Sequence, residues 1–251
     1  MGDIRSSLGS PIREGKTKIV YESDNPDEVI LKFKNDITAL DGEKHDIIKG
    51  KGYINAFISA KLFELLESAG LPTHYKAYIT PNLMVARKVE MLPVEVVCRN
   101  IAAGHLLKRL PIAEGTKLKI PIVEFFYKSD ELHDPMLNDY HMQLLGLANT
   151  KEIREMEEIT LNVNKVLTKF MKKRGLSLVD FKIEFGRDGD GRLLVGDEIN
   201  ADSMRVWKES GEILDKDVYR KGGTLEHVLQ TYISYFKTVM GEEPSPEALK
   251  S

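Results

Sequence analysis

Residues 181–207 constrain the fold of this chain most, because they have the pattern of a β-hairpin that carries acids in its apolar runs. Two apolar runs are joined by a segment rich in Gly and Asp, which is typical of a hairpin turn. Glu184 lies within the first run, and Asp197 and Glu198 follow the second run. The apolar neighbours of these acids favour a covered sheet, and a solvated edge hairpin with scattered charge is the alternative.

The position of the turn decides whether the acids of the hairpin meet. If the Asp-Gly pair at 190–191 forms a two-residue type I′ turn, Glu184 lies directly opposite Asp197. If the Asp-Gly pair at 188–189 forms the turn, Glu184 faces Leu193 and the acids separate. Opposed residues have Cβ atoms about 5 Å apart, so two half-buried carboxylates would need a cation between them. A few oxygen ligands suit Mg²⁺ shared with phosphates, and the first register therefore predicts a metal–nucleotide site.

The whole chain has the size and composition of a soluble globular protein. Its 251 residues suffice for one large domain or two small ones. The net charge of −3 gives no reason to expect nucleic-acid binding. The sequence has no apolar stretch that could cross a bilayer and begins without a hydrophobic signal segment, so we expect no membrane association and a cytoplasmic protein. The single cysteine, Cys98, excludes an intrachain disulfide and lies in an apolar run, which predicts a buried side chain.

The N-terminal part has the pattern of short strands joined by a basic, glycine-containing connection. Two strand-like pieces flank Gly15, and another strand is expected at 29–33. A glycine near a strand end could place backbone N–H groups and Lys16 or Lys18 over phosphates. The segment lacks the G-x-x-x-x-G-K-[ST] pattern of a Walker A loop, and a solvated basic strand is the alternative.

The following residues predict a loop, a helix and several strands. Residues 35–51 are polar and rich in acid, which favours a long loop. From Gly52 the apolar residues recur at helical spacing until Gly70 and Pro72 end the run. Strands are expected at 74–79, 83–90 and 95–103.

An apolar connector at 89–94 is a candidate seam between two lobes. Free backbone groups there could hold an adenine, and a plain strand break is the alternative. Arg99 and Asn100 interrupt the strand that follows, and Gly104 and His105 open a short helix. Free N–H groups at a helix start suit an anion, and a guanidinium beside them can bind phosphate or carboxylate in a fork. A structural salt bridge of Arg99 is the alternative.

The second half of the chain predicts mainly helices around the hairpin. The expected elements are a strand at 120–127, a polar loop at 128–135, helices at 136–145, 151–173 and 224–240, and a loop that contains Arg205 and Trp207. The six histidines have no metal spacing, and no H-E-x-x-H, C-x-x-C or G-x-S-x-G motif occurs. Hydrolase triads and zinc chemistry are therefore disfavoured.

Taken together and in this order, several segments resemble the SAICAR synthetase family, the phosphoribosylaminoimidazole-succinocarboxamide synthases. The segments are Gly15-Lys16-Thr17-Lys18, Asn35-Asp36 with Asp41-Gly42, residues 91–95 with Arg99-Asn100, Ala102-Ala103-Gly104, residues 128–130 with 133–135, residues 180–186, Gly196-Asp197-Glu198, Ser203 with Arg205 and Trp207, and residues 215–217 with Arg220. Each piece is short, but their joint order over roughly residues 12–240 is specific.

The resemblance implies an ATP-dependent ligase of de novo purine biosynthesis. Such an enzyme joins the carboxylate of carboxyaminoimidazole ribonucleotide to L-aspartate through an acyl phosphate and releases ADP and phosphate. It also implies an α+β, two-lobed fold and a homodimer. Residues 1–90 would form an N-terminal antiparallel-sheet lobe of kinase-like outline with the phosphate loop. Residues 91–251 would form an α+β, ATP-grasp-like lobe with the metal, ribonucleotide and aspartate sites.

The resemblance also assigns roles to individual residues. The nucleotide is assigned to Gly15, Lys16, Lys18, Val89 and Met91, and Mg²⁺ to Glu184 and Asp197. Catalysis is assigned to Lys16, Lys182, Glu184 and Asp197. The ribonucleotide is assigned to Asp41, Arg99, His105, Arg205 and Arg220, and the aspartate side to Lys128, Asp130 and Asp134. This chain departs from the family pattern at His105, where serine is usual, at Leu40, where glycine is common, and at Asn200-Ala201, where Ser-Pro is usual.

Two other functions compete with the ligase. A small-molecule kinase of related two-lobed fold is suggested by the lysine-bearing first lobe, although no H-R-D or D-F-G sequence is present. A non-catalytic nucleotide-binding module would bind ATP without releasing phosphate. Dependence on aspartate separates the ligase from both.

Overall fold

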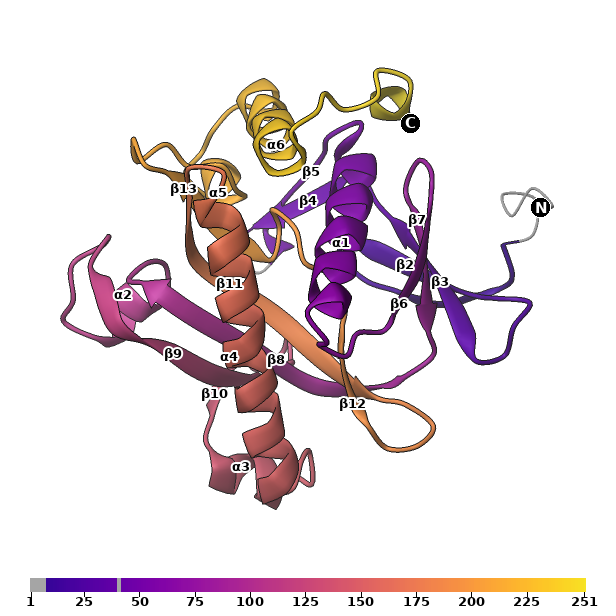
Figure 1. Ribbon diagram of the computed structural model, residues 1–251, viewed down its shortest axis with the longest axis vertical. Coiled ribbons are helices and arrows are strands. Elements are labelled where there is room, and N and C mark those ends of the chain that lie inside the picture. The colour runs from indigo at the N-terminus through magenta and orange to yellow at the C-terminus, as the bar shows by residue number, and fades with distance from the viewer. Residues whose placement is uncertain (1–7, 40–41) are drawn as a thin grey trace.

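The structure is a computed structural model that describes residues 8–39 and 42–251, which form an α+β fold of antiparallel sheets and helices (Figure 1). This confirms the α+β class that the resemblance implies. Asp41, which is assigned to the ribonucleotide by resemblance, lies outside the described residues. Within those residues, no helix combines the length and the apolar character that crossing a bilayer requires.

Five strands of the N-terminal part form the first sheet. In spatial order they are β1 (Pro11–Glu14), β2 (Lys18–Glu22), β3 (Glu28–Phe33), β7 (Leu83–Arg87) and β6 (Tyr75–Ile79). Ile30, Leu31 and Phe33 of β3 are buried, and helix α1 (Lys51–Ser68) packs against β3, β6 and β7. The strands around Gly15 and the helix after Gly52 are confirmed.

The second sheet is built around two long strands. Its order is β10 (Met136–Leu137), β9 (Lys117–Tyr127), β8 (Glu90–Ile101), β11 (Leu176–Arg187) and β12 (Leu193–Gly196), and β13 (Met204–Lys208) also pairs with β11. Strand β8 already includes residues 90–94. The apolar connector expected at 89–94 is therefore wrong, except at Val89, which precedes the strand. The expected loop around Arg205 and Trp207 is also wrong, because these residues pair with the first half of β11.

The two faces of the second sheet differ in character because alternate residues of a strand point to opposite sides. On one face, Phe181 and Ile183 of β11 and Cys98 of β8 are buried. Helix α4 (Thr150–Lys172) packs on β8, β9 and β11 and lies in front of this sheet in Figure 1. Its buried stripe from Ile153 to Met171 confirms the predicted helix, and burial of Cys98 is confirmed as well. The opposite face of β11 therefore has to carry the polar side chains.

The hairpin of β11 and β12 adopts neither of the two predicted registers. Glu184 pairs with Gly196, one residue short of Asp197, and Asp188 donates its backbone N–H to Arg192 across a three-residue connection. The carboxylate of Asp188 accepts the backbone N–H groups of Asp190 and Arg192, and Gly191 has a φ of +78°. A glycine in this left-handed conformation is typical of three-residue hairpin loops. The side chain of Asp188 therefore selects a loop that the Asp-Gly pairs alone did not indicate.

Two other expectations are corrected by the structure. The segment 35–51, expected as a loop, forms a two-stranded hairpin of β4 (Asp36–Ala39) and β5 (Lys44–Ile47). This hairpin docks on α5 (Asp217–Arg220), where Tyr219 donates to Asp46 at 2.7 Å and its ring lies 3.8 Å from Lys44 Nζ. The expected helix 136–145 is shorter, because residues 136–137 form β10 before α3 (Asp139–Leu144) begins.

The remaining elements close the core between the two sheets. Helix α6 (Leu225–Met240) packs against α1, and the C-terminal turn η3 (Ala248–Lys250) also contacts α1. The short helix α2 (Leu106–Arg109) follows β8. One hydrophobic cluster contains residues of both sheets, from Leu31 and Phe33 to Phe181 and Ile183. The two sheets are therefore joined by a shared apolar core.

Candidate active site

The polar face of the second sheet gathers the charged side chains that the sequence singled out. Strand β11 presents Asp180, Lys182 and Glu184 at every second position. On the neighbouring strand β8, Arg99 lies opposite Asp180 and Glu95 lies opposite Glu184. Acids directly opposite each other destabilise a sheet unless a cation compensates, so this face is built to hold positive charge.

Glu184 and Asp197 are brought into one electrostatic cluster at the end of this face. Asp197 follows β12 and has a φ of +61°, a backbone conformation that residues other than glycine rarely adopt. Burial and the nearby charge of Asp197 raise the pKa of Glu184. Burial opposes ionisation of Asp197 too, yet the ammonium groups of Lys18, Lys182 and Lys128 hold its pKa below the usual range. The charges of the two acids therefore interact, and both acids are attracted to the same cations.

Three lysines from distant parts of the chain neutralise these acids. Lys128 Nζ lies 2.6 and 2.7 Å from the two carboxylate oxygens of Glu184. Lys18 Nζ lies 3.0 Å from Asp197 Oδ1. Lys182 Nζ lies 3.6 Å from Glu184 Oε1 and donates to Glu95. Burial would lower the pKa of Lys182, but Glu184, Glu95 and Asp197 raise it, so Lys182 remains charged.

The donor set at this point suits a magnesium ion bound together with phosphates. Glu184 and Asp197 offer carboxylate oxygens, and each carboxylate already holds an ammonium group in close contact. Among the described residues, no group of three or more His, Cys, Asp or Glu side chains has the arrangement of a metal site. Mg²⁺ commonly takes only one or two carboxylates and completes its shell with water and substrate phosphates, so the two acids fit it.

The basic connection between β1 and β2 reaches the polar loop that follows β9. Gly15 donates its backbone N–H to Lys18 O at 2.8 Å, which closes the tight connection. Lys16 Nζ lies 2.6 Å from Asp130 Oδ1, and both side chains are exposed. Asp134 Oδ1 accepts the backbone N–H of Ser129 and so shapes the loop from within. The structure thus brings the expected phosphate loop and the expected aspartate-side loop together.

A second cluster on the same face contains the arginines. Arg99 is buried and donates to Glu124 at 2.6 Å and to Asp180 at 2.9 Å. Arg205 on β13 donates to the same Asp180 oxygen at 2.9 Å and to Asp217 at 2.7 Å. Asp180 therefore receives a guanidinium from each neighbouring strand, which holds both arginines against one carboxylate oxygen.

Arg220 and Gly104 complete this arginine cluster. Arg220 on α5 donates to Asp217 Oδ1 at 2.6 Å, so Asp217 joins it to Arg205. Gly104 has a φ of +57°, and a Cβ there would lie 2.6 Å from Arg205 Nη2. The guanidinium of Arg205 thus lies directly against the backbone before α2. His105, which precedes α2, is exposed on the same connection.

Val89 and Met91 lie beside the acid cluster, against the glycines of the hairpin. A Cβ at Gly186 would lie 2.5 Å from Val89 Cγ2 and 3.1 Å from Met91 Sδ. A Cβ at Gly196 would lie 3.2 Å from Met91 Sδ. A side chain at 186 would displace Val89, whereas one at 196 would only require the flexible Met91 to shift slightly.

Several residues of the site were not assigned a role from the sequence. They are Glu95, Glu124, Asp180, Glu198, Lys216 and Asp217. Alternation along residues 180–184 could have revealed Asp180, since it shares a face with Lys182 and Glu184. Glu95 and Glu124 have no such signal, because their relation to β11 depends on the pairing of strands far apart in the sequence.

Lys216, directly before α5, gives a pH-dependent prediction. Burial lowers its pKa to about 8, with Asp202 opposing the shift and Lys51 adding to it. Between this value and the ordinary pKa of 10.5, the unfolded chain binds more protons, so stability rises with pH there and is lost as pH falls through 8. Relative to Lys216→Met, the wild type should therefore gain unfolding free energy between about pH 8 and pH 10.5 in urea titrations. A difference that stays constant over this range would contradict the assignment.

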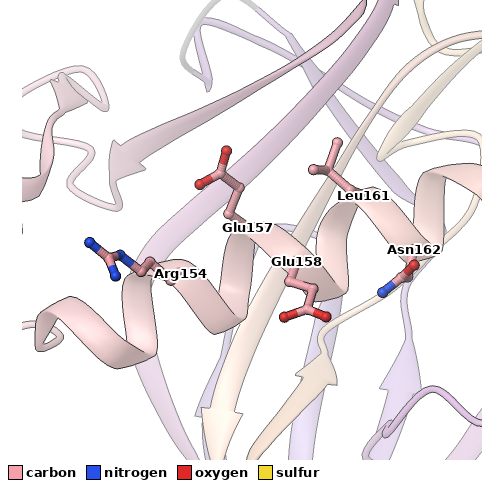
Figure 2. Close-up of a pocket in the computed structure, with 5 residues that line it drawn as sticks. All are labelled: Arg154, Glu157, Glu158, Leu161 and Asn162. Carbon is pink, nitrogen blue, oxygen red and sulfur yellow. The ribbon is translucent and has the colours of Figure 1, made fainter.

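A shallow surface hollow elsewhere has no part in this site. Figure 2 shows it on the outer face of α4, where its lining side chains all come from one helix. They are Arg154, Glu157, Glu158, Leu161 and Asn162, and all five are exposed. This face of α4 points away from the sheet that carries the charged cluster, and spaced charges on a helix surface are usually solvated.

Comparisons with known proteins agree with the composition of the site. A family model described as SAICAR synthetase matches residues 11–235. The phosphoribosylaminoimidazole-succinocarboxamide synthase of Methanocaldococcus jannaschii is 54% identical over 212 residues, covering 84% of this chain and 87% of the relative. The synthase of the same description from Sulfurisphaera tokodaii is 54% identical over 229 residues, covering 91% and 97%. A solved structure described as SAICAR synthetase (Type-2) in complex with ADP aligns with a TM-score of 0.89 at 44% identity, covering 93% of this chain and 99% of that chain.

Proposed function

The chain belongs to the SAICAR synthetase family, and from this premise we propose how its residues divide the work of the reaction. It is an ATP-dependent ligase that joins carboxyaminoimidazole ribonucleotide to L-aspartate in purine biosynthesis. This assignment favours the ligase over a small-molecule kinase and over a non-catalytic binding module. One observation carries the division of roles: the acid pair Glu184 and Asp197 shares its lysines at one end of a polar face whose other end holds arginines.

The acid end of the face is the proposed site of the triphosphate. Glu184 and Asp197 would hold Mg²⁺, which neutralises phosphate charge when bound. Lys16 and Lys18, beside Gly15, would contact the phosphates, because Lys18 pairs with Asp197 and Lys16 lies on the same tight connection. Val89 and Met91 would hold the adenine, since they lie next to the hairpin glycines beside Asp197.

The arginine end is the proposed site of the ribonucleotide. Arg99, Arg205 and Arg220 are linked by Asp180 and Asp217, and guanidinium groups bind phosphate and carboxylate in a fork. His105 at the start of α2 would add an N–H donor where the family usually has serine. Asp41 is assigned to the same substrate by family resemblance alone.

The proposed chemistry needs orientation and charge neutralisation more than a protein nucleophile. The substrate carboxylate attacks the γ-phosphorus of ATP, which forms an acyl phosphate and releases ADP. The amine of aspartate then attacks the acyl carbon, phosphate leaves, and the nitrogen loses a proton. Lys182 would orient the carboxylate of the ribonucleotide. Lys128, Asp130 and Asp134 would form the loop that binds L-aspartate. Positioned cations account for this kind of phosphoryl transfer.

We further propose a two-lobed enzyme that acts as a cytoplasmic homodimer. Residues 1–90, with the first sheet, would form the kinase-like lobe, and residues 91–251, with the second sheet, the ATP-grasp-like lobe. The first sheet ends at β7 and the second begins at β8, which supports this division. Exposed apolar side chains on α3, such as Tyr140 and Leu144, support a protein contact there. Light scattering after size-exclusion chromatography would test the dimer.

The decisive assay is phosphate release from ATP with the carboxylated ribonucleotide, with L-aspartate added or withheld. The ligase predicts sustained phosphate release only when all three substrates are present, together with formation of the aspartate adduct. Equal ADP formation without aspartate would indicate a kinase. Tight ATP binding without phosphate release under any condition would indicate a binding module.

The substitution Gly104→Ala should weaken binding of the ribonucleotide. The new Cβ would lie 2.6 Å from Arg205 Nη2, so Arg205 must move. The alanine would also have to adopt a φ of +57°. We expect the KM for the ribonucleotide to rise about 10-fold, as for a lost charge-assisted hydrogen bond, with the KM for ATP unchanged. Gly146→Ala, which also has a positive φ but open space around its Cβ, is the matched control. Equal effects of both variants on that KM would contradict the contact with Arg205.

A further inference from the structure

Glu198 is a buried acid that follows the proposed metal ligand Asp197 and has no assigned role. It is 5% exposed. Its Oε1 accepts from Thr17 at 3.0 Å and lies 3.1 Å from Lys18 Nζ, and its Oε2 accepts from Asn200 at 2.9 Å. Both carboxylate oxygens are therefore engaged, which leaves Glu198 poorly placed to bind a ligand itself.

These contacts join the phosphate loop of the first sheet to the acid cluster of the second. Thr17 Oγ1 accepts from Lys18 at 3.2 Å and donates to Glu198, so the three side chains form a closed ring. Lys18 Nζ is shared between Asp197 at 3.0 Å and Glu198 at 3.1 Å. Burial would lower the pKa of Lys18, but Asp197 and Glu198 raise it. The lysine is held charged and fixed between two adjacent acids.

The segment that carries Glu198 is itself anchored to the helical layer. Asn200 donates to Ser59 of α1 at 3.0 Å as well as to Glu198. Asp202 lies 2.5 Å from Lys51 Nζ of α1 and accepts from Tyr232 of α6. Glu198 therefore has a rigid support, as a residue that positions another must have.

We propose that Glu198 is a positioning residue that holds Lys18 at the phosphates by sharing its ammonium group with Asp197. The inference rests on the proposed function, because it takes Lys18 as a phosphate contact. Without the charge of Glu198, Lys18 keeps Asp197, at 3.0 Å, as the only acid of this pair. The ammonium is then drawn toward Asp197 and away from the position beside Thr17 that the ring of side chains fixes.

The test compares Glu198→Gln with Glu152→Gln. Glu152 makes a similar pair with Arg187, at 2.6 Å, on the α4 side of the sheet away from the cluster. We expect Glu198→Gln to weaken ADP binding on the order of 10-fold to 100-fold, measured by calorimetry in EDTA. The KM for ATP should rise by a similar factor while the KM for aspartate stays unchanged. The Glu152→Gln variant should match the wild type in all three quantities.

Unchanged ADP affinity in Glu198→Gln, or an equal rise of every KM, would overturn the positioning role. If this variant does not fold, Thr17→Val removes one member of the ring and should weaken ADP binding about 3-fold to 10-fold; unchanged binding would overturn the proposal. Different results would refute the proposed function and the role of Glu198. A wild type that binds ADP without turnover would refute the ligase roles, whereas normal wild-type turnover with an unaffected Glu198→Gln would refute only the role of Glu198.

Discussion

Replacing Asp197 by Asn should reduce kcat on the order of 100-fold to 1,000-fold, the loss typical of removing one electrostatic stabiliser of the transition state. The amide keeps the size of the side chain but loses the charge that Lys18, Lys182 and Lys128 surround. Lys18 retains Glu198 at 3.1 Å, so the local fold keeps an ion pair. The free energy of unfolding should therefore change far less than the activation free energy.

Steady-state kinetics at saturating Mg²⁺ and ATP, combined with urea unfolding, checks this prediction. Asp190→Asn is the matched control, because Asp190 belongs to the same hairpin but pairs with the exposed Arg192 at 2.7 Å in the turn. It should have wild-type kcat. Unchanged turnover in Asp197→Asn would refute the assigned role, and a loss explained by unfolding would remove its support.

Replacing Lys51 by Met should destabilise the protein by about 3–5 kcal/mol, the range observed when one partner of a buried ion pair is removed. Lys51 is fully buried at the start of α1, and its Nζ lies 2.5 Å from Asp202 Oδ2. Asp202 would keep hydrogen bonds from Asn55 at 2.9 Å and from Tyr232 but would lose the cation that attracts it most strongly. A buried carboxylate left with only the weaker attraction of Lys216 accounts for most of the loss.

Urea denaturation of Lys51→Met, Lys61→Met and the double variant Lys51→Met with Asp202→Asn tests the buried pair. Lys61 lies on the same helix and makes an exposed pair with Glu64 at 2.8 Å, so its replacement should cost less than about 1 kcal/mol. The double variant should recover part of the loss, because it removes the buried carboxylate that lost Lys51. Equal effects at the two lysines would contradict the account.

Much of the fold could be predicted from the sequence because its patterns are local. The apolar stripe of residues 151–173 predicted α4, and the run after Gly52 predicted α1 to within two residues. The hairpin register could not be predicted, since it depends on Asp188 accepting two backbone N–H groups in a three-residue loop. Residues 35–51 were predicted as a loop because their many acids outweigh the short apolar pattern of Ile37 and Ala39. These two side chains are buried in the β4–β5 hairpin.

In the candidate site, too, the residues with a local sequence signal were predicted and those without one were missed. Acids inside apolar runs drew attention to Glu184 and Asp197, and the structure brings them into one cluster although they are not directly paired. Family resemblance supplied the arginines and the basic loop. The partners that orient these groups were missed, because Glu95 meets Glu184 only through the pairing of β8 with β11. The register of strands far apart in the sequence is a property of the folded sheet and leaves no local signal.

We propose that Glu184 and Asp197 together bind one divalent ion against the phosphates. The most direct test of this proposal is a crystal structure of the protein with ADP and Mn²⁺, in which anomalous scattering locates the ion. The account predicts a single strong peak at a coordination distance of about 2.1 Å from a carboxylate oxygen of each acid, next to the β-phosphate and Lys18. An ion held by phosphate alone, or one that contacts neither acid, would contradict it.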